Sequence, residues 1–168
     1  MSTSPQNSTT DAAPAGVPSK APAGIDPRGP RFGAALTAIL LLAVIVLAPS
    51  AAAYVIAGIV VAGFTLGAFG GISRTWQGQV YKKFVAPRLA PPTEREDPRP
   101  PTFAQLVGLI ILGVGFVLGL VGVPNALLIS AILAFIAAFL NAVFNFCLGC
   151  EIYGIGVRLR NRGSATAA

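Results

Sequence analysis

The sequence lacks histidine and is poor in charged residues, and each shortage excludes a class of function. Histidine is the commonest metal ligand and the usual general base near neutral pH, so any catalysis must use carboxylates, thiols, hydroxyls or amines. Charged residues form 11% of the chain and hydrophobic residues 54%, whereas charged residues form about 25% of a soluble domain. The two cysteines are too few for a disulfide framework. This composition is typical of a membrane protein and disfavours a soluble enzyme with a buried catalytic pocket.

The basic residues fall into three groups that are separated by apolar stretches. The groups are Lys20, Arg28 and Arg31; Arg74, Lys82, Lys83, Arg88, Arg95 and Arg99; and Arg158, Arg160 and Arg162. The connections over 49–54 and 122–125 carry no charge. Since loops rich in Lys and Arg stay in the cytoplasm, this pattern predicts a multi-pass protein of the plasma membrane with cytoplasmic N and C termini. The net charge of +6 is then explained by topology and by lipid head groups, and no nucleic-acid partner is expected.

Four apolar stretches predict helices over about 32–48, 52–72, 102–121 and 125–150, each close to the length that crosses a bilayer. They form a transmembrane domain over 26–157. Residues 1–25 have too few bulky side chains to fold and predict a disordered cytoplasmic tail, and 158–168 form a basic cytoplasmic C-terminal tail. Between the second and third helices, apolar residues at 76, 80, 81, 84 and 85 share one face. They predict an interfacial amphipathic segment over 76–89.

An internal repeat, D-P-R-x-P-x-F, precedes the first and third helices. Its residues are Asp26, Arg28 and Phe32 in the first copy and Asp97, Arg99 and Phe103 in the second. We interpret the motif as the point where the chain enters the membrane, because proline stops the helix, arginine meets lipid phosphate and phenylalanine enters the interface. A binding role is the less favoured alternative. The predicted fold is an all-α, integral membrane four-helix bundle made of two parallel-repeat helical hairpins.

The first helix also has features of a signal peptide, since basic residues precede it and small residues follow it at 50–53. The repeat equates this helix with the third one, which has no such features. We therefore expect it to be a retained membrane span.

The candidate chemical site is the thiol pair Cys147 and Cys150 with the carboxylate Glu151, which share one arc of the fourth helix. A C-x-x-C pair can be redox-active, accept sulfur or supply half of a metal site, although a zinc site needs two more ligands. Because the motif would close a helix, the negative helix end and Glu151 would raise the pKa of both thiols. A disulfide within a helix would also be strained, unless Gly149 breaks the helix. A packing role for the two cysteines stays open beside a thiol-based role.

Asn141 and Asn145 lie one turn apart, and we expect them to make polar contacts between helices. The sequence establishes no catalytic residue, and no metal and no cofactor are expected. Whether the protein is an enzyme stays open, with a non-enzymatic protein favoured.

Three segments carry a family resemblance: DPRGPRF at 26–32, the loop with PRL at 87–89 and EDPRPPTFAQLVG at 96–108, and NFCLGCEIY at 145–153. Together they resemble the actinobacterial integral membrane family described only as a domain of unknown function, the four-three-nine-five family. The resemblance implies a membrane protein with the Cys-Leu-Gly-Cys-Glu signature and no established activity. It also implies a cytoplasmic thioredoxin-like or sulfurtransferase protein as partner.

Three functions are consistent with these residues. The first is a membrane partner in thiol redox or sulfur-transfer metabolism, acting through the C-x-x-C at the cytoplasmic edge. The second is a small transporter or channel subunit, which would have to form a homo-oligomer because four short helices leave little room for a path. The third is a purely structural membrane scaffold within the lipid bilayer.

Overall fold

The computed structural model describes residues 24–92 and 95–166. Four of its helices are long and apolar enough to cross a membrane: α1 (Arg28–Leu47), α2 (Ala51–Gly70), α4 (Arg99–Leu120) and α5 (Ala126–Phe144). Apart from one isolated bridge, the described residues contain no strand. The all-α four-helix prediction is therefore confirmed. The tail expected over 1–25, with Lys20, lies outside the described residues except for its last two positions.

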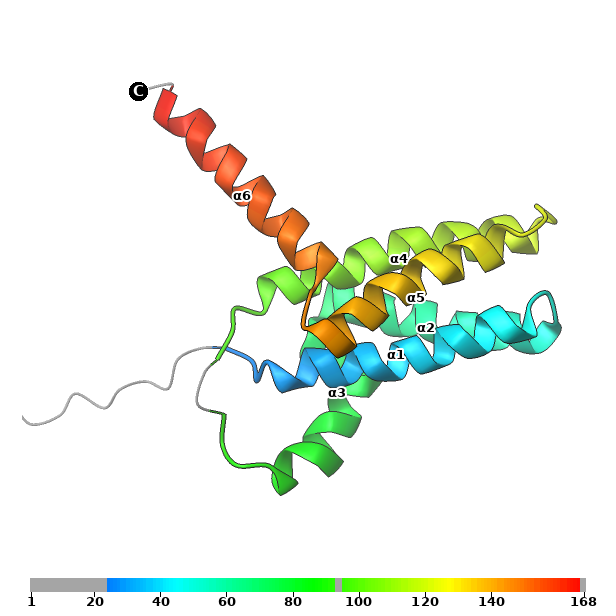
Figure 1. Cartoon of the computed structure of the whole chain (residues 1–168), viewed down its shortest axis with the longest axis horizontal. Coiled ribbons are helices and arrows are strands. Elements are labelled where there is room, and N and C mark those ends of the chain that lie inside the picture. The colour runs from blue at the N-terminus through cyan, green and yellow to red at the C-terminus, as the bar shows by residue number, and fades with distance from the viewer. Residues whose placement is uncertain (1–23, 93–94, 167–168) are drawn as a thin grey trace, which may run out of the picture.

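The four long helices form a closed ring in which α1 and α4 each pack against both α2 and α5 (Figure 1). The fully buried side chains at its centre are few, the largest being Leu41, Val44, Val60 and Leu112. Large apolar side chains instead cover the outside, where Val46 is 73% exposed and Phe69 is 78% exposed. Helices that are apolar all round suit a lipid environment.

Two further helical segments project from the ring at one end, and we name them the first and second arm. The first arm consists of α3 (Trp76–Val80), η2 (Tyr81–Val85) and η3 (Ala86–Arg88), and follows the short turn η1 (Ile72–Arg74). The second arm is α6 (Leu148–Thr166), which leaves the ring obliquely (Figure 1). The segment expected over 76–89 is thus helical, whereas its place at a lipid interface stays a prediction.

The two halves of the chain meet at a bridge between equivalent residues. Ile25 and Glu96, which directly precede the two D-P-R motifs, pair antiparallel, each donating its N–H to the other's carbonyl at 3.0 Å. In the first copy Asp26 Oδ1 accepts the backbone N–H of Arg28 at 2.9 Å. In the second copy Asp97 Oδ1 accepts that of Arg99, also at 2.9 Å. An aspartate that bonds two residues ahead supports a turn, so each aspartate fixes the chain where a long helix begins.

The arms are equivalent too. Phe32 of the first motif contacts Tyr81 of the first arm, with ring centroids 5.8 Å apart. Phe103 of the second motif contacts Tyr153 of the second arm at 5.7 Å. Since α1 and α4 also run in the same direction (Figure 1), the halves are related in the parallel sense that the repeat predicts.

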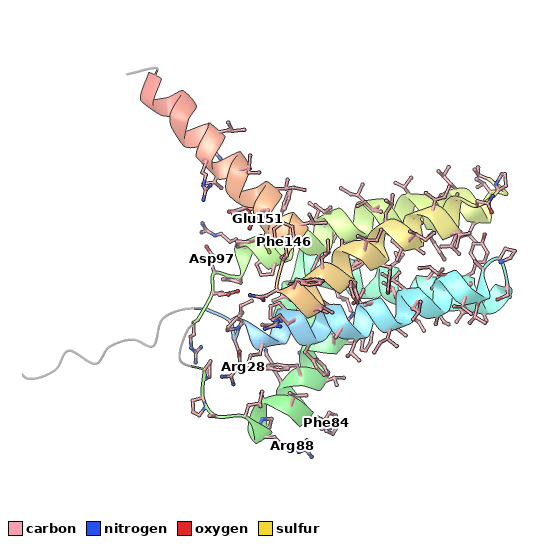
Figure 2. All side chains as sticks on the ribbon, in the orientation of Figure 1. Arg28, Phe84, Arg88, Asp97, Phe146 and Glu151 are labelled. Carbon is pink, nitrogen blue, oxygen red and sulfur yellow. The ribbon has the colours of Figure 1, made fainter. Side chains whose placement is uncertain are left out.

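Charge separates along the ring as the sequence predicts. Both uncharged connections, over 48–50 and 121–125, lie at one end, while the starts of α1 and α4 and both arms lie at the other (Figure 1). We call the latter the basic end. Figure 2 shows Arg28 and Asp97 there, with Phe84 and Arg88 on the outer part of the first arm.

The helix expected over 125–150 is two helices, which is the main difference from the sequence prediction. Asn145 adopts a left-handed conformation with φ 56° and ends α5, and Phe146 N–H bonds back to Leu140 O at 3.2 Å. Asparagine tolerates this conformation and commonly ends helices in it. The chain then restarts as α6, which continues to Thr166 through most of the tail expected over 158–168.

Candidate functional site

The C-x-x-C motif opens a helix instead of closing one, which corrects the sequence-based expectation. Leu148 is the first residue of α6, and the carbonyl of Cys147 accepts the N–H of Glu151 at 3.0 Å. That bond is the first of the helix, so Cys147 is the residue that caps it. The thiols therefore lie at the positive end of the helix dipole, where a thiolate is stabilised.

The first arm shows the same cap built with a hydroxyl. Thr75 caps α3, and its Oγ1 accepts the N–H of Gly78 at 3.0 Å. In the second arm the corresponding positions are Cys147 and Cys150. Cys147 thus places a thiol where the other half has a conventional helix-capping hydroxyl.

The two thiols differ in acidity. The pKa of Cys147 is lowered to about 7, first because it accepts a hydrogen bond from the Cys150 thiol, and further because it accepts the N–H groups of Cys150 and Gly149. Burial and the charge of Glu151 oppose this shift. The pKa of Cys150 is raised well above its usual value, first because its thiol donates to Cys147, then by burial. The pair therefore combines a thiolate with a protonated neighbour, which is what a nucleophilic and a resolving thiol require.

Packing against the start of α4 holds this site in place. Gly149 is buried, and a Cβ added to it would lie 2.6 Å from Ala104 Cα, so the backbones of α6 and α4 are in direct contact. The contact between Phe103 and Tyr153 supports the same junction. The charge of Glu96, from the bridge, contributes to the raised pKa of Cys150. Both thiols are free and half-buried at this junction.

Glu151 lies in the first turn of α6 and is exposed, outside the four candidate membrane spans. Figure 2 shows it at the base of α6, near the start of α4. The structure brings it together with both cysteines, whose pKa values its charge raises. Asn145 ends α5 through its backbone conformation. The contacts between helices expected for the Asn141 and Asn145 side chains stay predictions.

The first D-P-R motif joins the first arm to α1. Tyr81 is buried and donates its hydroxyl to Asp26 Oδ2 at 2.7 Å. The pKa of Tyr81 is raised to about 12, chiefly by burial and then by this bond. Arg28 also donates to Ala90 O at 3.1 Å. Asp26 and Arg28 thus tie the loop and the first arm to the start of α1.

A cavity between α1 and the first arm was not anticipated from the sequence. It has a volume of about 400 Å³, and its lining includes Thr37 and Gln77, which are both buried. Gln77 and Trp76 pack against Gly63 of α2. Thr37, Trp76 and Gln77 are uncharged and are not typical catalytic or metal-binding residues, so the sequence gives no sign of a site at these positions. The described residues contain no cluster of three or more His, Cys, Asp or Glu side chains that could hold a metal ion.

A family model described as "Domain of unknown function (DUF4395)" matches residues 25–158. The match begins at the bridge residue Ile25 and includes both D-P-R motifs, the first arm and the C-x-x-C motif. No curated protein and no solved structure matches the chain.

Proposed function

This chain belongs to the DUF4395 family, whose description gives no activity, and we propose that it is a membrane-bound protein that exchanges thiols and disulfides through Cys147 and Cys150. The observation that carries the proposal is the position of Cys147 at the N-terminus of α6. Four helices that could span a membrane support the membrane assignment.

Cys147 is the nucleophile of this proposal. With a pKa of about 7, a large share of it is thiolate at neutral pH. An attacking thiol is most effective when its pKa lies near the ambient pH, because a lower pKa costs nucleophilicity. Cys147 is half-buried, so a partner has to bring its disulfide to the base of α6.

The reaction proceeds in two steps. The Cys147 thiolate attacks a disulfide of the partner, forming a mixed disulfide and releasing one partner thiolate. Cys150, losing its proton to solvent, then attacks the Cys147 sulfur and releases the second partner thiolate. The partner disulfide gains two electrons and becomes a dithiol, and Cys147 and Cys150 lose two electrons and become a disulfide. Because Cys147 precedes the helix, this bond does not have to form between two residues of a regular helix.

The partner in this proposal is a cytoplasmic thioredoxin-like or sulfurtransferase protein. The basic end is assigned to the cytoplasm because Lys- and Arg-rich segments remain on that side, so both termini are cytoplasmic and the plasma membrane is the expected location. Both arms lie at this end (Figure 1) and offer the docking surface, and Cys150 lies in the first turn of the second arm. A sulfurtransferase would deliver a sulfane sulfur to the same Cys147 thiolate, forming a persulfide and leaving its own cysteine as thiolate.

Trapping tests the proposal directly. In membranes that hold the full chain, Cys150→Ser lets Cys147 attack but removes the resolving thiol, so mixed disulfides accumulate and dissolve on reduction. Cys147→Ser is the matched control and should accumulate far less. The variant removes the hydrogen bond to Cys147, but burial and the charges of Glu96 and Glu151 still raise the pKa of the Cys150 thiol.

Two outcomes contradict the proposal. One is the absence of any mixed disulfide or persulfide on Cys147 in Cys150→Ser under either oxidising or reducing conditions. The other is equal trapping by both single variants, which would reflect exposure and not activation. Either result would leave the cysteines with the packing role of a structural scaffold.

A further inference from the structure

The cavity between α1 and the first arm lies at the basic end, away from the thiol pair. Its volume of about 400 Å³ falls within the range of small-molecule sites. Thr37 and Gln77 line it towards the ring, and Lys82 and Arg95 are the exposed cations that line it. Neither cysteine is part of it.

Gln77 gives the cavity an unsatisfied polar group. Its side chain is only 4% exposed, and its Nε2 donates to Thr37 Oγ1 at 3.4 Å. Its Oε1 is buried and has no hydrogen-bond partner among the described residues. Trp76 Nε1, which also lies against Gly63 of α2, is the other buried atom without a partner there. Buried polar atoms almost always have a partner, so the unpaired amide oxygen of a side chain that lines a cavity indicates a ligand or water that donates to it.

The two halves of the chain differ at this place. In the second half Gly149 brings the base of α6 directly against Ala104 of α4. In the first half Gln77 stands near Gly33 of α1, and a Cβ on Gly33 would lie 3.7 Å from Gln77 Cβ, in ordinary contact. A glutamine therefore separates the first arm from α1, where a glycine closes the second arm onto α4. The cavity follows from this replacement.

The charges around the cavity favour an anion. Lys82 and Arg95 contribute positive charge at its exposed side. Among the described residues, Asp26 is the carboxylate that lines it, and both of its oxygens are already engaged, one by the Arg28 N–H and the other by the Tyr81 hydroxyl. A ligand thus meets two exposed cations outside, of which Arg95 also donates to Gly24 O at 3.2 Å, and an amide acceptor inside.

We propose that this cavity binds a phosphate ester that carries a free hydroxyl, with the phosphate between Lys82 and Arg95 and the hydroxyl donating to Gln77 Oε1. Lysine and arginine are the usual partners of phosphate. A phospholipid head group such as that of phosphatidylglycerol and a soluble compound such as glycerol phosphate share this chemistry. The site does not depend on the thiols, so it stands or falls separately from the thiol-exchange proposal.

Trp76 supplies the readout, because it is the chain's one tryptophan and adjoins Gln77. The full chain is placed in nanodiscs of phosphatidylcholine, and Trp76 emission is followed while glycerol phosphate is added to the solution. In a second arm of the experiment, phosphatidylglycerol replaces part of the phosphatidylcholine. A saturable change in either arm supports the site, and the arm that gives it identifies the soluble or the lipid source.

Variants make the test specific. Gln77→Leu is expected to weaken binding by about 10-fold, the effect of losing one good hydrogen bond. Lys82→Gln is expected to weaken it by about as much, and the matched Lys83→Gln by less than about twofold, because Lys83 does not line the cavity. Lys82 and Lys83 are exposed, so replacing either one should not prevent folding. The comparison of Lys82→Gln with Lys83→Gln therefore tests the site even if Gln77→Leu does not fold. Cys147→Ser is expected to leave the titration unchanged.

Two results would overturn the proposal. One is the absence of a saturable change with both probes, in which case water satisfies Gln77. The other is equal weakening by Lys82→Gln and Lys83→Gln, which would mean that general surface charge attracts the anion.

Discussion

Replacing Cys150 with alanine removes the donor that contributes most to the low pKa of Cys147. The N–H groups of Gly149 and residue 150 remain, so the pKa should rise only part of the way from about 7 towards the ordinary 9.0. At about pH 7, a pKa of 7 gives roughly half thiolate and a pKa of 9 roughly 1%, a ratio of about 50. We expect Cys150→Ala to lie between these limits, with a pKa about one unit higher and therefore roughly fivefold less thiolate near pH 7.

The alkylation rate of Cys147 will change less than its thiolate content. A thiolate of higher pKa is the stronger nucleophile, so a roughly fivefold loss of thiolate becomes a loss of about twofold in rate near pH 7. The midpoint of the pH profile avoids this compensation and should move up by about one pH unit.

The assay is pulsed iodoacetamide labelling of the full chain between about pH 5 and about pH 10, with the Cys147 peptide quantified by mass spectrometry. Cys150→Ser is the control, because a hydroxyl still donates to Cys147 and should keep the midpoint below that of Cys150→Ala. A wild-type midpoint near the ordinary thiol value of 9.0 would refute the argument that Cys147 is activated by capping α6. The same refutation would follow if wild type and Cys150→Ala had one midpoint.

Two further predictions concern packing and pH. Gly115→Ala should destabilise the ring by about 3 kcal/mol or more in detergent thermal unfolding, since its Cβ would lie 1.9 Å from Ser130 Oγ. Gly113→Ala, whose Cβ would meet nothing closer than 3.7 Å, should be nearly neutral, and equal losses would contradict this packing. The raised pKa of Tyr81 means that its protonated form is favoured by folding, so this stabilisation is present below the ordinary value of 10.0 and is lost as pH rises through about 12. Tyr81→Phe lacks the hydrogen bond to Asp26, so its free energy of unfolding should fall less than that of the wild type as the pH rises over this range. If the two proteins lose stability equally, the Tyr81 hydroxyl does not contribute.

The sequence predicted the parts of the fold that depend on long-range pattern. Charge placement separated the ends of the ring, and the paired Asp26 and Asp97 motifs identified the repeat. Both signals are distributed over many residues, so the prediction does not depend on any single side chain.

The break at Asn145 could not be predicted from hydropathy, since the apolar character continues through 144–153 without proline. The available signal was local, because asparagine is, after glycine, a residue that ends helices in the left-handed conformation. Without this signal the sequence predicts a raised pKa for both thiols, which is wrong for Cys147, whose pKa is lowered, while the pKa of Cys150 is raised as expected. The equivalence of Tyr81 and Tyr153 was also available as a sign that the two arms correspond.

The cavity was beyond sequence reasoning for a different reason. It depends on the size of one side chain, Gln77, where the other half has Gly149, and on the unpaired Oε1 atom that results. Only the packing of the first arm against α1 reveals either fact.

The connections that precede the two arms differ in length, and this difference limits which side chains each arm can carry. In the first half the turn over 71–75 folds back so closely that a Cβ on Gly78 would lie 2.6 Å from Ile72 O. The shorter connection over 145–147 precedes α6, and there the corresponding position carries the Cys150 side chain. A second thiol pair could therefore not be created in the first arm by substitution alone. Connection length, more than residue identity, therefore restricts a thiol pair at this position to the second half, while the first half encloses the cavity.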